Sequence, residues 1–427
     1  MCCFENNLEF DTMISEIKIK NLKSFNDQFV SLNNFNVLIG ACASGKSNFI
    51  EIFKFLKDIS MDFENGINKH GGSFLRNFNL NSGDEPSFLK VGYDFPVSIP
   101  EFCKSIDGNI FLKVDFNKIE YGLMFNIDDD NLCEILNEIV KIEFKVFNDE
   151  NDELLSENAL YLRNLKGNVS IDFEKSEEYV LLEAFIPQSL LNIVNNNLKN
   201  ETALMINSAL ASTPVSWASF FKNLKFYNFD PKFCKTINKI NGHSELSELG
   251  DTLPVVLDRI AGDGENKRKF LNLLSNILPY IDDVEIKQIM DNQRLFSLLE
   301  SYSDVLIPAP LVSDGTSNIM ALIIALYFEK SNVIFIEEPE RNIHPAFFIK
   351  IVEMMKEVSA NKQIMITTHS PEILKYCELN DIYFISRDKH GFSNISKPIE
   401  NDIVKPFIEE LGIDEVFVDD YLGLGNE

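Results

Sequence analysis

The sequence has few cysteines and no pairing pattern among them. The seven cysteines stand at positions 2, 3, 42, 103, 133, 234 and 377, and none forms a C-x-x-C pair. An odd number of scattered cysteines argues against a disulfide framework and against a zinc site, and it favours the reduced thiols of a cytosol. The opening residues, MCCFENNLEFDT, are acidic and lack the apolar segment of a signal peptide. We therefore expect a cytoplasmic protein.

Long apolar runs and positive charge are also scarce. The longest apolar run, Ile319 to Phe328, is too short to cross a bilayer, so no membrane partner is expected. The 427 residues contain 39 lysines and arginines against 66 aspartates and glutamates, a net charge of −27. Such a chain repels phosphate backbones on average, which argues against a broad electrostatic grip on DNA. A local basic strip, and with it a DNA partner, stays open.

The hydrophobic pattern changes along the chain. Strands are predicted by the alternating stretch from Met13 and by the mostly apolar run Phe35 to Ile39. The helical spacing of apolar residues in SNFIEIFKFLKDI predicts a helix after them. From about 87 to 147 the alternation predicts an antiparallel β lobe, and residues 180–224 predict short helices. The C-terminal third alternates strand and helix, which favours a largely parallel sheet. No heptad pattern persists, so a long coiled-coil arm is not expected.

The stretch VLIGACASGKSNF contains the pattern G-x-x-x-x-G-K-S between a predicted strand and a predicted helix. Backbone N–H groups of such a loop and of the helix N-terminus can cradle phosphates. Lys46 would neutralise the β- and γ-phosphates, and the Ser47 hydroxyl would bind Mg²⁺. The alternative is a chance Gly-Lys-Ser turn, which the flanking strand and helix make a poor explanation.

Two further predicted strands end in polar residues. The run NVIFIEEPE places Glu337 and Glu338 at a strand end, where one carboxylate would help to hold Mg²⁺ and the next would polarise the attacking water. The run QIMITTHSP places His369 in the same situation, within reach of a γ-phosphate. The alternatives are a strand that ends in a charged turn and a structural histidine.

A fourth segment, LVSDGTSNIMALIIALYF, begins with polar residues and continues as a strongly apolar helix. Ser313 or Asp314 would cap this helix, and the free N–H groups beside Gly315 would form an anion site. An ordinary capped helix is the competing interpretation, so this segment is weak by itself.

The four segments in this order resemble the ABC-type ATPases of the SMC/RecF/OLD superfamily. The similarity is most specific to compact ATPases that carry an AAA-domain label, whose strings GANASGKSN, LSDGT, EEPExxLHP and TTHSP appear here as GACASGKSN, VSDGT, EEPERNIHP and TTHSP. It extends to LKFYNFDP and LPVVLDRI, and it is vague between about 85 and 215. The resemblance implies an α/β ABC-type P-loop ATPase head with a mainly parallel core sheet, an antiparallel β lobe and a helical insertion.

The resemblance also implies the domain ranges and the roles of individual residues. The ranges are a flexible extension (1–12), the N-terminal part of the head (13–84), the β lobe with the helical insertion (85–222) and the C-terminal part of the head (223–427). Either Met1 or Met13 stays open as the start. The implied nucleotide-binding residues are Gly40, Ala43, Ser44, Gly45, Lys46, Ser47, Asn48, Ser313, Asp314 and Gly315. Ser47 and Glu337 would serve Mg²⁺, Glu338 would be the general base, and His369 would sense the γ-phosphate.

The remaining implied features concern the dimer interface and two departures from the family pattern. Ser313 to Gly315 would form the signature segment that meets the nucleotide of an opposite protomer, and Asn342 and His344 would lie in the D-loop along that interface. Cys42 replaces an asparagine that is common in the family's loop, which puts nucleotide affinity in doubt. No glutamine lies between Ser47 and Gln188, so the Q-loop residue is unassigned.

These implications favour an ATP-hydrolysing switch with ATP and Mg²⁺ as cofactors. It would form a homodimer or higher oligomer on binding ATP and control DNA maintenance or antiviral defence through a separate nuclease or toxin. A slowly hydrolysing or non-hydrolysing nucleotide-gated scaffold that holds a partner inactive is the alternative. A transporter subunit is disfavoured by the long insertion and by the E-E-P-E and S-D-G-T strings.

Overall fold

The computed structural model describes residues 12–75, 85–105, 108–128, 132–148, 151–174, 217–239, 245–289, 293–402 and 405–418. The expected flexible extension and most of the expected helical insertion lie outside these residues. The described chain forms two compact units. Unit 1 comprises Met1–Asn33, Asn48–Leu224 and Arg387–Ile395, and unit 2 comprises Asn34–Ser47, Lys225–Ser386 and Ser396–Glu427.

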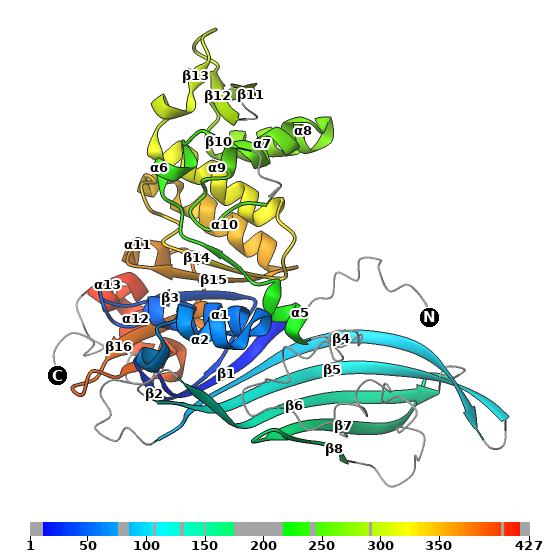
Figure 1. Ribbon diagram of the computed structural model, residues 1–427. Helices are drawn as coiled ribbons and strands as arrows, with labels where there is room; N and C mark the ends of the chain where they lie inside the picture. Colours follow the sequence, from blue (N-terminus) through cyan, green and yellow to red (C-terminus); the bar gives the residue numbers. More distant parts are fainter. Residues whose placement is uncertain are drawn as a thin grey trace. The chain divides into compact units, whose positions relative to one another are not determined.

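Unit 1 is built on a seven-stranded antiparallel sheet in the order β2-β1-β4-β5-β6-β7-β8 (Figure 1). Its strands are β1 (Met13–Leu22), β2 (Phe25–Ser31), β4 (Ser87–Ser105), β5 (Gly108–Ile127), β6 (Cys133–Asn148), β7 (Glu153–Leu165) and β8 (Asn168–Glu174). The alternating sequence explains the sheet, because successive side chains of a strand point to opposite faces. On β5, for example, Ile119 and Tyr121 are fully buried, whereas Glu120 is not.

Helices supply the apolar partners for one face of this sheet. They are α1 (Lys46–Met61), α2 (Phe63–Lys69), the 3₁₀ turn η1 (Gly72–Leu75) and α5 (Trp217–Lys222). The ring of Phe55 on α1 lies 5.9 Å from that of Phe125 on β5, and Phe221 on α5 lies 6.1 Å from Tyr121. In unit 1, β1 and β2 share one sheet with β4 to β8.

Unit 2 contains a parallel sheet whose strands run in the order β16-β3-β15-β14-β9. They are β3 (Phe35–Ile39), β9 (Lys225–Tyr227), β14 (Val333–Glu337), β15 (Gln363–Thr368) and β16 (Ile382–Arg387), and β17 (Ser393–Ser396) follows β16 along the chain. The buried runs of β3, β14 and β15 are typical of strands covered on both faces. This confirms the expected parallel core sheet.

The helices of unit 2 carry its apolar core. They are α6 (Pro231–Cys234), α7 (Leu253–Ala261), α8 (Gly264–Ile277), α9 (Asp314–Tyr327), α10 (Phe348–Ser359), α11 (Pro371–Leu374), α12 (Lys405–Leu411) and α13 (Ile413–Val418). The 3₁₀ turns are η4 (Ala309–Leu311), η5 (Pro345–Phe347), η6 (Leu379–Asp381) and η7 (Pro398–Glu400). Among the described residues, none of the helices combines the length and the apolarity that a membrane span requires.

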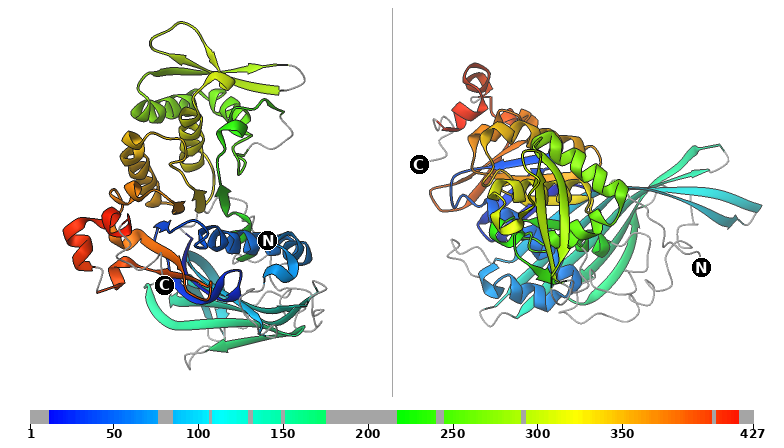
Figure 2. Two further views of the ribbon diagram at one scale, coloured as in Figure 1. Left: turned by 90° about the vertical axis from the view of Figure 1, so that its left-hand side faces the viewer. Right: turned by 90° about the horizontal axis from the view of Figure 1, so that it is seen from above.

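A second, antiparallel sheet in unit 2 was not expected from the sequence. It consists of β10 (Asn238–Lys239), β11 (Ile281–Gln288), β12 (Gln293–Glu300) and β13 (Ile307–Pro308). Both views of Figure 2 show these strands, in green and yellow, against α7 and α8. Phe296 and Leu298 are buried in the core that these helices share, so tertiary packing stabilises strands whose own alternation is short.

Candidate nucleotide-binding site

The phosphate-loop motif leaves the end of β3 and leads directly into α1. Gly40 must be glycine here, because a Cβ atom would lie 2.1 Å from the carbonyl oxygen of Ile385 and 2.7 Å from Ser44 Oγ. Two loop residues have left-handed backbone, Ala43 with φ 62° and Gly45 with φ 116°. Such a conformation turns successive N–H groups toward one side, which is how phosphate loops make an anion-binding concavity.

The side chain of Lys46 folds back onto the backbone of this loop. Its Nζ donates hydrogen bonds to the carbonyl oxygens of Gly40 at 2.7 Å and Ala41 at 2.9 Å. Burial lowers the pKa of Lys46 to about 8, although Coulombic interactions with Cys42 and Glu338 oppose that shift. Cys42 itself is exposed and free. An anion that entered the loop would therefore meet a buried ammonium group with little water around it.

Ser47 and Glu337 converge at the carboxyl end of the parallel sheet. Ser47 Oγ donates to Glu337 Oε2 at 3.3 Å, although the two residues are almost three hundred positions apart. The register explains this meeting, because Glu337 pairs with Thr367 and Thr368 pairs with Ile39, so the strands end at one edge. A hydroxyl and a carboxylate oxygen are the hard ligands that Mg²⁺ prefers.

Glu338 directly follows β14 and has a left-handed backbone, with φ 46°. Its N–H donates to the carbonyl oxygen of Thr367 at 2.8 Å. Its Oε2 accepts from Arg341 Nε at 3.0 Å and Nη2 at 2.8 Å, and its Oε1 lies 3.5 Å from His369 Nε2. A non-glycine residue in this region of φ and ψ costs of order 1–3 kcal/mol and is typical of functional sites.

His369 follows β15 and lies between the phosphate loop and Glu338. Its Nδ1 lies 3.4 Å from Lys46 Nζ. Burial lowers the pKa of His369, and the Lys46 ammonium adds to this effect, while Glu338 opposes it. These directions favour a neutral ring at pH 7.

Glu340 lies in the same motif as Glu338, but no role could be assigned to it from the sequence. Thr368 Oγ1 donates to Glu340 Oε1, and the Ser370 N–H donates to Thr368 Oγ1 at 2.9 Å. Burial raises the pKa of Glu340, and the Thr368 hydrogen bond opposes that shift. Glu340 therefore fixes the backbone on both sides of His369.

The proposed signature segment begins α9. Ser313 is the N-cap, because its Oγ accepts from the Thr316 N–H at 3.1 Å. Asp314 is ion-paired with Lys235, which follows α6. Among the described contacts, the side chains of Ser313 and Asp314 engage their own helix and α6, whereas Lys46 and Ser47 engage the strand ends.

The signature segment also contacts the proposed D-loop. A Cβ atom on Gly315 would lie 2.7 Å from the carbonyl oxygen of Asn342, and Asn342 has a left-handed backbone with φ 61°. Asn318 Nδ2 donates to the carbonyl oxygen of Arg341 at 2.8 Å. His344 Nδ1 accepts from the Ala346 N–H at 3.2 Å and so begins η5.

The structure brings together most of the residues that the sequence singled out. Strand ends in unit 2 carry the loop from Gly40 to Ser47, the pair Glu337 and Glu338, and His369. Asn48, the last proposed phosphate ligand, belongs to unit 1, where its Nδ2 donates to Ser24 Oγ at 2.9 Å. Sequence reasoning missed Glu340 and Arg341, although both stand inside the string EEPERNIHP.

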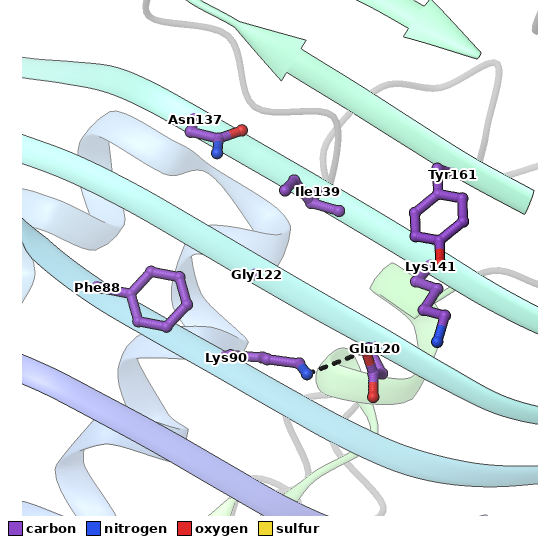
Figure 3. Close-up of a pocket in the computed structure, with 8 residues that line it drawn as sticks. All are labelled: Phe88, Lys90, Glu120, Gly122, Asn137, Ile139, Lys141 and Tyr161. Atoms are coloured by element: carbon purple, nitrogen blue, oxygen red, sulfur yellow. Dashed lines mark ion pairs between the residues drawn. The ribbon is translucent and has the colours of Figure 1, made fainter. Parts of the chain in front are cut away.

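A separate hollow of about 220 Å³ lies on the open face of the unit 1 sheet (Figure 3). It is lined by Phe88, Lys90, Glu120, Gly122, Asn137, Ile139, Lys141 and Tyr161. Lys90 Nζ lies 3.0 Å from Glu120 Oε2, and Lys141 is ion-paired with Glu143. The charged groups of this hollow are thus ion-paired within the sheet.

Comparison with known proteins identifies a family for most of the chain. Residues 35–375 match the family described as "AAA domain, putative AbiEii toxin, Type IV TA system". One curated relative, the uncharacterized protein MJECL43 of Methanocaldococcus jannaschii, is 28% identical over 87 residues, which are 20% of this chain and 23% of that protein. The chain thus spans about a quarter of the length of that relative.

Three solved structures that match the chain are SMC head domains. The Thermotoga maritima SMC head domain has 10% identity and a TM-score of 0.40, with 90% of this chain and 98% of that chain covered. The Pyrococcus furiosus Smc head with an extended coiled coil, bound to the C-terminal domain of ScpA, has 12% identity and a TM-score of 0.46, with 94% and 99% covered. An SmcHead bound to the C-winged helix domain of ScpA has 14% identity and a TM-score of 0.43, with 90% and 96% covered. We assign the α/β fold from the strand order of this chain's own sheets.

Proposed function

The chain belongs to this AAA-domain family of P-loop ATPases, and on that premise we propose that it binds and hydrolyses Mg-ATP as a dimeric switch. The observation that carries the proposal is the convergence at one sheet edge of Lys46, Ser47, Glu337, Glu338 and His369. These residues supply a cation for phosphates, oxygen ligands for a metal and a carboxylate for proton abstraction, which phosphoryl transfer requires.

The residues present fit both ATP and Mg²⁺. Gly45 and Ala43 have the backbone of an anion-binding loop, and the buried Lys46 ammonium lacks a carboxylate partner among its hydrogen bonds. Ser47 and Glu337 would hold Mg²⁺ through oxygen atoms. When bound there, Mg²⁺ would neutralise charge on the β- and γ-phosphates.

The other side chains of the site would orient and activate water. Glu338 would accept a proton from the attacking water, and its Oε1 is the oxygen that faces His369. The neutral His369 ring would donate a hydrogen bond to the γ-phosphate, while Lys46 would exchange its carbonyl partners for phosphate oxygens. Preorganised charges of this kind usually supply the largest share of such catalysis.

The placement of the signature segment supports a proposal of dimerisation. Ser313, Asp314 and Gly315 begin α9, and their free N–H groups would suit the γ-phosphate held by a second copy of the chain. Binding that favours the closed dimer would shift the population toward it, and hydrolysis would release it. The defence role and the separate nuclease or toxin partner rest on the family description alone, and a DNA ligand rests on the SMC/RecF resemblance.

A nucleotide-gated scaffold with little turnover is the second candidate function. One observation favours it, because Arg341 occupies Oε2 of Glu338 with two hydrogen bonds and so blocks one oxygen that could accept a proton. Under this candidate the removal of Arg341 should not slow hydrolysis, whereas a positioning role for Arg341 predicts a slower reaction. In that case the nucleotide state would hold a partner protein inactive without a need for rapid hydrolysis.

Native mass spectrometry with and without Mg-ATP, combined with ATP binding and phosphate release, tests these proposals. Lys46→Ala should abolish ATP binding, and Glu338→Gln should retain binding, lose hydrolysis and trap the dimer. Unchanged ATP binding in Lys46→Ala would reject the site. Negligible turnover of the wild type, with no trapping by Glu338→Gln, would favour the scaffold.

A further inference from the structure

We propose that Arg341 is a positioning residue that orients the Glu338 carboxylate and couples it to the signature helix α9. The inference rests on the proposed function of Glu338 as the general base. Arg341 was not singled out by the sequence, because a single arginine in a turn after a strand carries no pattern of its own. The structure assigns it a role through contacts at three different places.

The first contact is with the proposed base. The Arg341 N–H donates to the Glu338 carbonyl oxygen at 3.0 Å, which forms a tight turn. That turn brings the guanidinium back onto the carboxylate, where Nε and Nη2 both donate to Oε2 at 3.0 and 2.8 Å. Because the guanidinium is planar and rigid, its two N–H groups hold this carboxylate oxygen in one direction, which the ammonium group of a lysine cannot do.

The second contact anchors the guanidinium itself. Arg341 Nη1 donates to Asn228 Oδ1 at 3.0 Å and to the Phe229 carbonyl oxygen at 3.5 Å. Both acceptors directly follow β9, which is hydrogen-bonded to β14 in the same sheet. The guanidinium is therefore hydrogen-bonded to Glu338 on one side and to the residues after β9 on the other, which restricts the rotation of the Glu338 side chain.

The third contact reaches the signature helix. Asn318, which is buried on α9, donates from Nδ2 to the Arg341 carbonyl oxygen at 2.8 Å. One turn earlier, Gly315 lies so close to the Asn342 carbonyl oxygen that no side chain would fit. A shift of α9 on meeting the nucleotide of a second protomer would thus move the Arg341 backbone, and through the guanidinium the base.

This arrangement has a consequence for the reaction. Because Arg341 occupies Oε2, the remaining oxygen, Oε1, faces His369 and is the one available to a water molecule. Arg341 would not touch the substrate. Its removal should let Glu338 sample other rotamers, which slows proton abstraction without weakening the phosphate contacts of the loop.

The test compares Arg341→Ala and Arg341→Lys with the wild type in steady-state ATPase kinetics and in equilibrium Mg-ATP binding. We expect Arg341→Ala to lower kcat about 10- to 100-fold, the range typical of outer-shell partners that orient a functional side chain. KM and the Kd for Mg-ATP should change less than about threefold. Arg341→Lys should be intermediate, because it keeps the charge but loses the fork.

Arg294→Ala is the matched control. Arg294 Nε donates to Asp258 Oδ2 at 2.7 Å, so this variant also removes an arginine–carboxylate pair from unit 2, and its kcat should stay at the wild-type value. In the Glu338→Gln background, Arg341→Ala should cause no further loss of the residual rate, because residues that act as a unit are not additive.

The outcomes separate this inference from the proposed function. If the wild type binds and hydrolyses ATP but Arg341→Ala keeps the wild-type kcat, or loses kcat and ATP affinity by the same factor, the inference is overturned alone. If the wild type fails to bind Mg-ATP or to turn it over, both fall. If Arg341→Ala does not fold, Arg341→Lys decides, and a wild-type kcat in that variant overturns the inference.

Discussion

The two sheets of this protein use their polar side chains in different ways. In the parallel sheet of unit 2, the polar residues of the candidate site follow the carboxyl ends of β3, β14 and β15 and meet at one edge. In the antiparallel sheet of unit 1, polar residues alternate along the strands and pair across them, as Lys90 and Lys118 do with Glu16 and Glu120. In the first arrangement the polar groups converge on one point, whereas in the second arrangement the charged groups neutralise one another.

Backbone crowding separates the two regions as well. The parallel sheet requires glycine at the loop, since Gly40 lies against the Ile385 carbonyl oxygen. In the antiparallel sheet, a Cβ atom on Gly92 would meet only flexible side chains, and one on Gly122 would have no described neighbour closer than 3.9 Å. Chemistry is therefore expected where close backbone approach and convergent polar groups coincide, and single substitutions test this.

The largest effect is expected at Gly40. Gly40→Ala would force a methyl group against the Ile385 backbone, which must displace the loop, and a displacement near 1 Å can cost about 100-fold in kcat/KM. Steady-state ATPase assays measure this loss. Gly264→Ala is the control, because a Cβ atom there meets nothing within 4 Å and wild-type kinetics are expected. Wild-type kinetics in Gly40→Ala would contradict the description of the loop.

The next effect is on the stability of unit 1. Glu138 is fully buried, and its carboxylate accepts from Tyr121 Oη at 2.9 Å and Asn164 Nδ2 at 3.3 Å. Glu138→Ala would leave buried donors unsatisfied and should lower the free energy of unfolding by about 1–3 kcal/mol. The midpoint of thermal unfolding measures the change.

Glu134→Ala on the same strand is the control for this prediction, because the exposed Glu134 is ion-paired only with Lys166 among the described residues and its loss should be nearly neutral. Mg-ATP affinity should stay within twofold in both variants. A large loss of ATP affinity in folded Glu138→Ala would contradict the different roles that we give to the antiparallel and the parallel sheet.

A third prediction concerns protons at the loop. Because the pKa of Lys46 is about 8, roughly half of its side chains are neutral at pH 8. The charged form is favoured by phosphates, so ATP binding at pH 8 should take up about half a proton at this residue and almost none at pH 6.5. Calorimetry in two buffers of different ionisation enthalpy measures the uptake. Lys46→Arg, which stays charged, should abolish it, and an unchanged uptake in that variant would refute the assignment.

The sign of the same shift also fixes its effect on folding. The folded-state pKa of Lys46 lies below its ordinary value of 10.5, so the unfolded chain binds more protons between pH 8 and 10.5. The contribution of Lys46 to stability therefore rises with pH across that window.

The smallest effect is expected on the open face of the antiparallel sheet. Lys90 is about one third exposed and shares its two carboxylate partners with Lys118. Lys90→Ala should change the free energy of unfolding by less than about 1 kcal/mol, because the pairs are solvated and Lys118 still contacts both carboxylates. Thermal unfolding measures it, and a loss of several kcal/mol would show that this face is not merely solvated.

Much of the fold could be predicted because its strands have strong local patterns. The mostly apolar runs of β3 and β15 predicted buried strands, and the structure places them side by side in the parallel sheet. The four-stranded sheet around β11 and β12 was missed, since these strands are half exposed and owe their stability to α7 and α8. The helical insertion expected within 85–222 lies mostly outside the described residues.

The phosphate loop, the carboxylate pair and the strand-terminal histidine could be predicted from the sequence, because each is a local run of residues with a fixed relation to a strand end. The contacts of Ser47 with Glu337 and of Lys46 with His369 could not, because they depend on parallel pairing that brings distant strand ends to one edge. The partners of Arg341 and Glu340 also depend on the tertiary structure, because a charged residue in a turn acquires a role only from the groups that surround it in space.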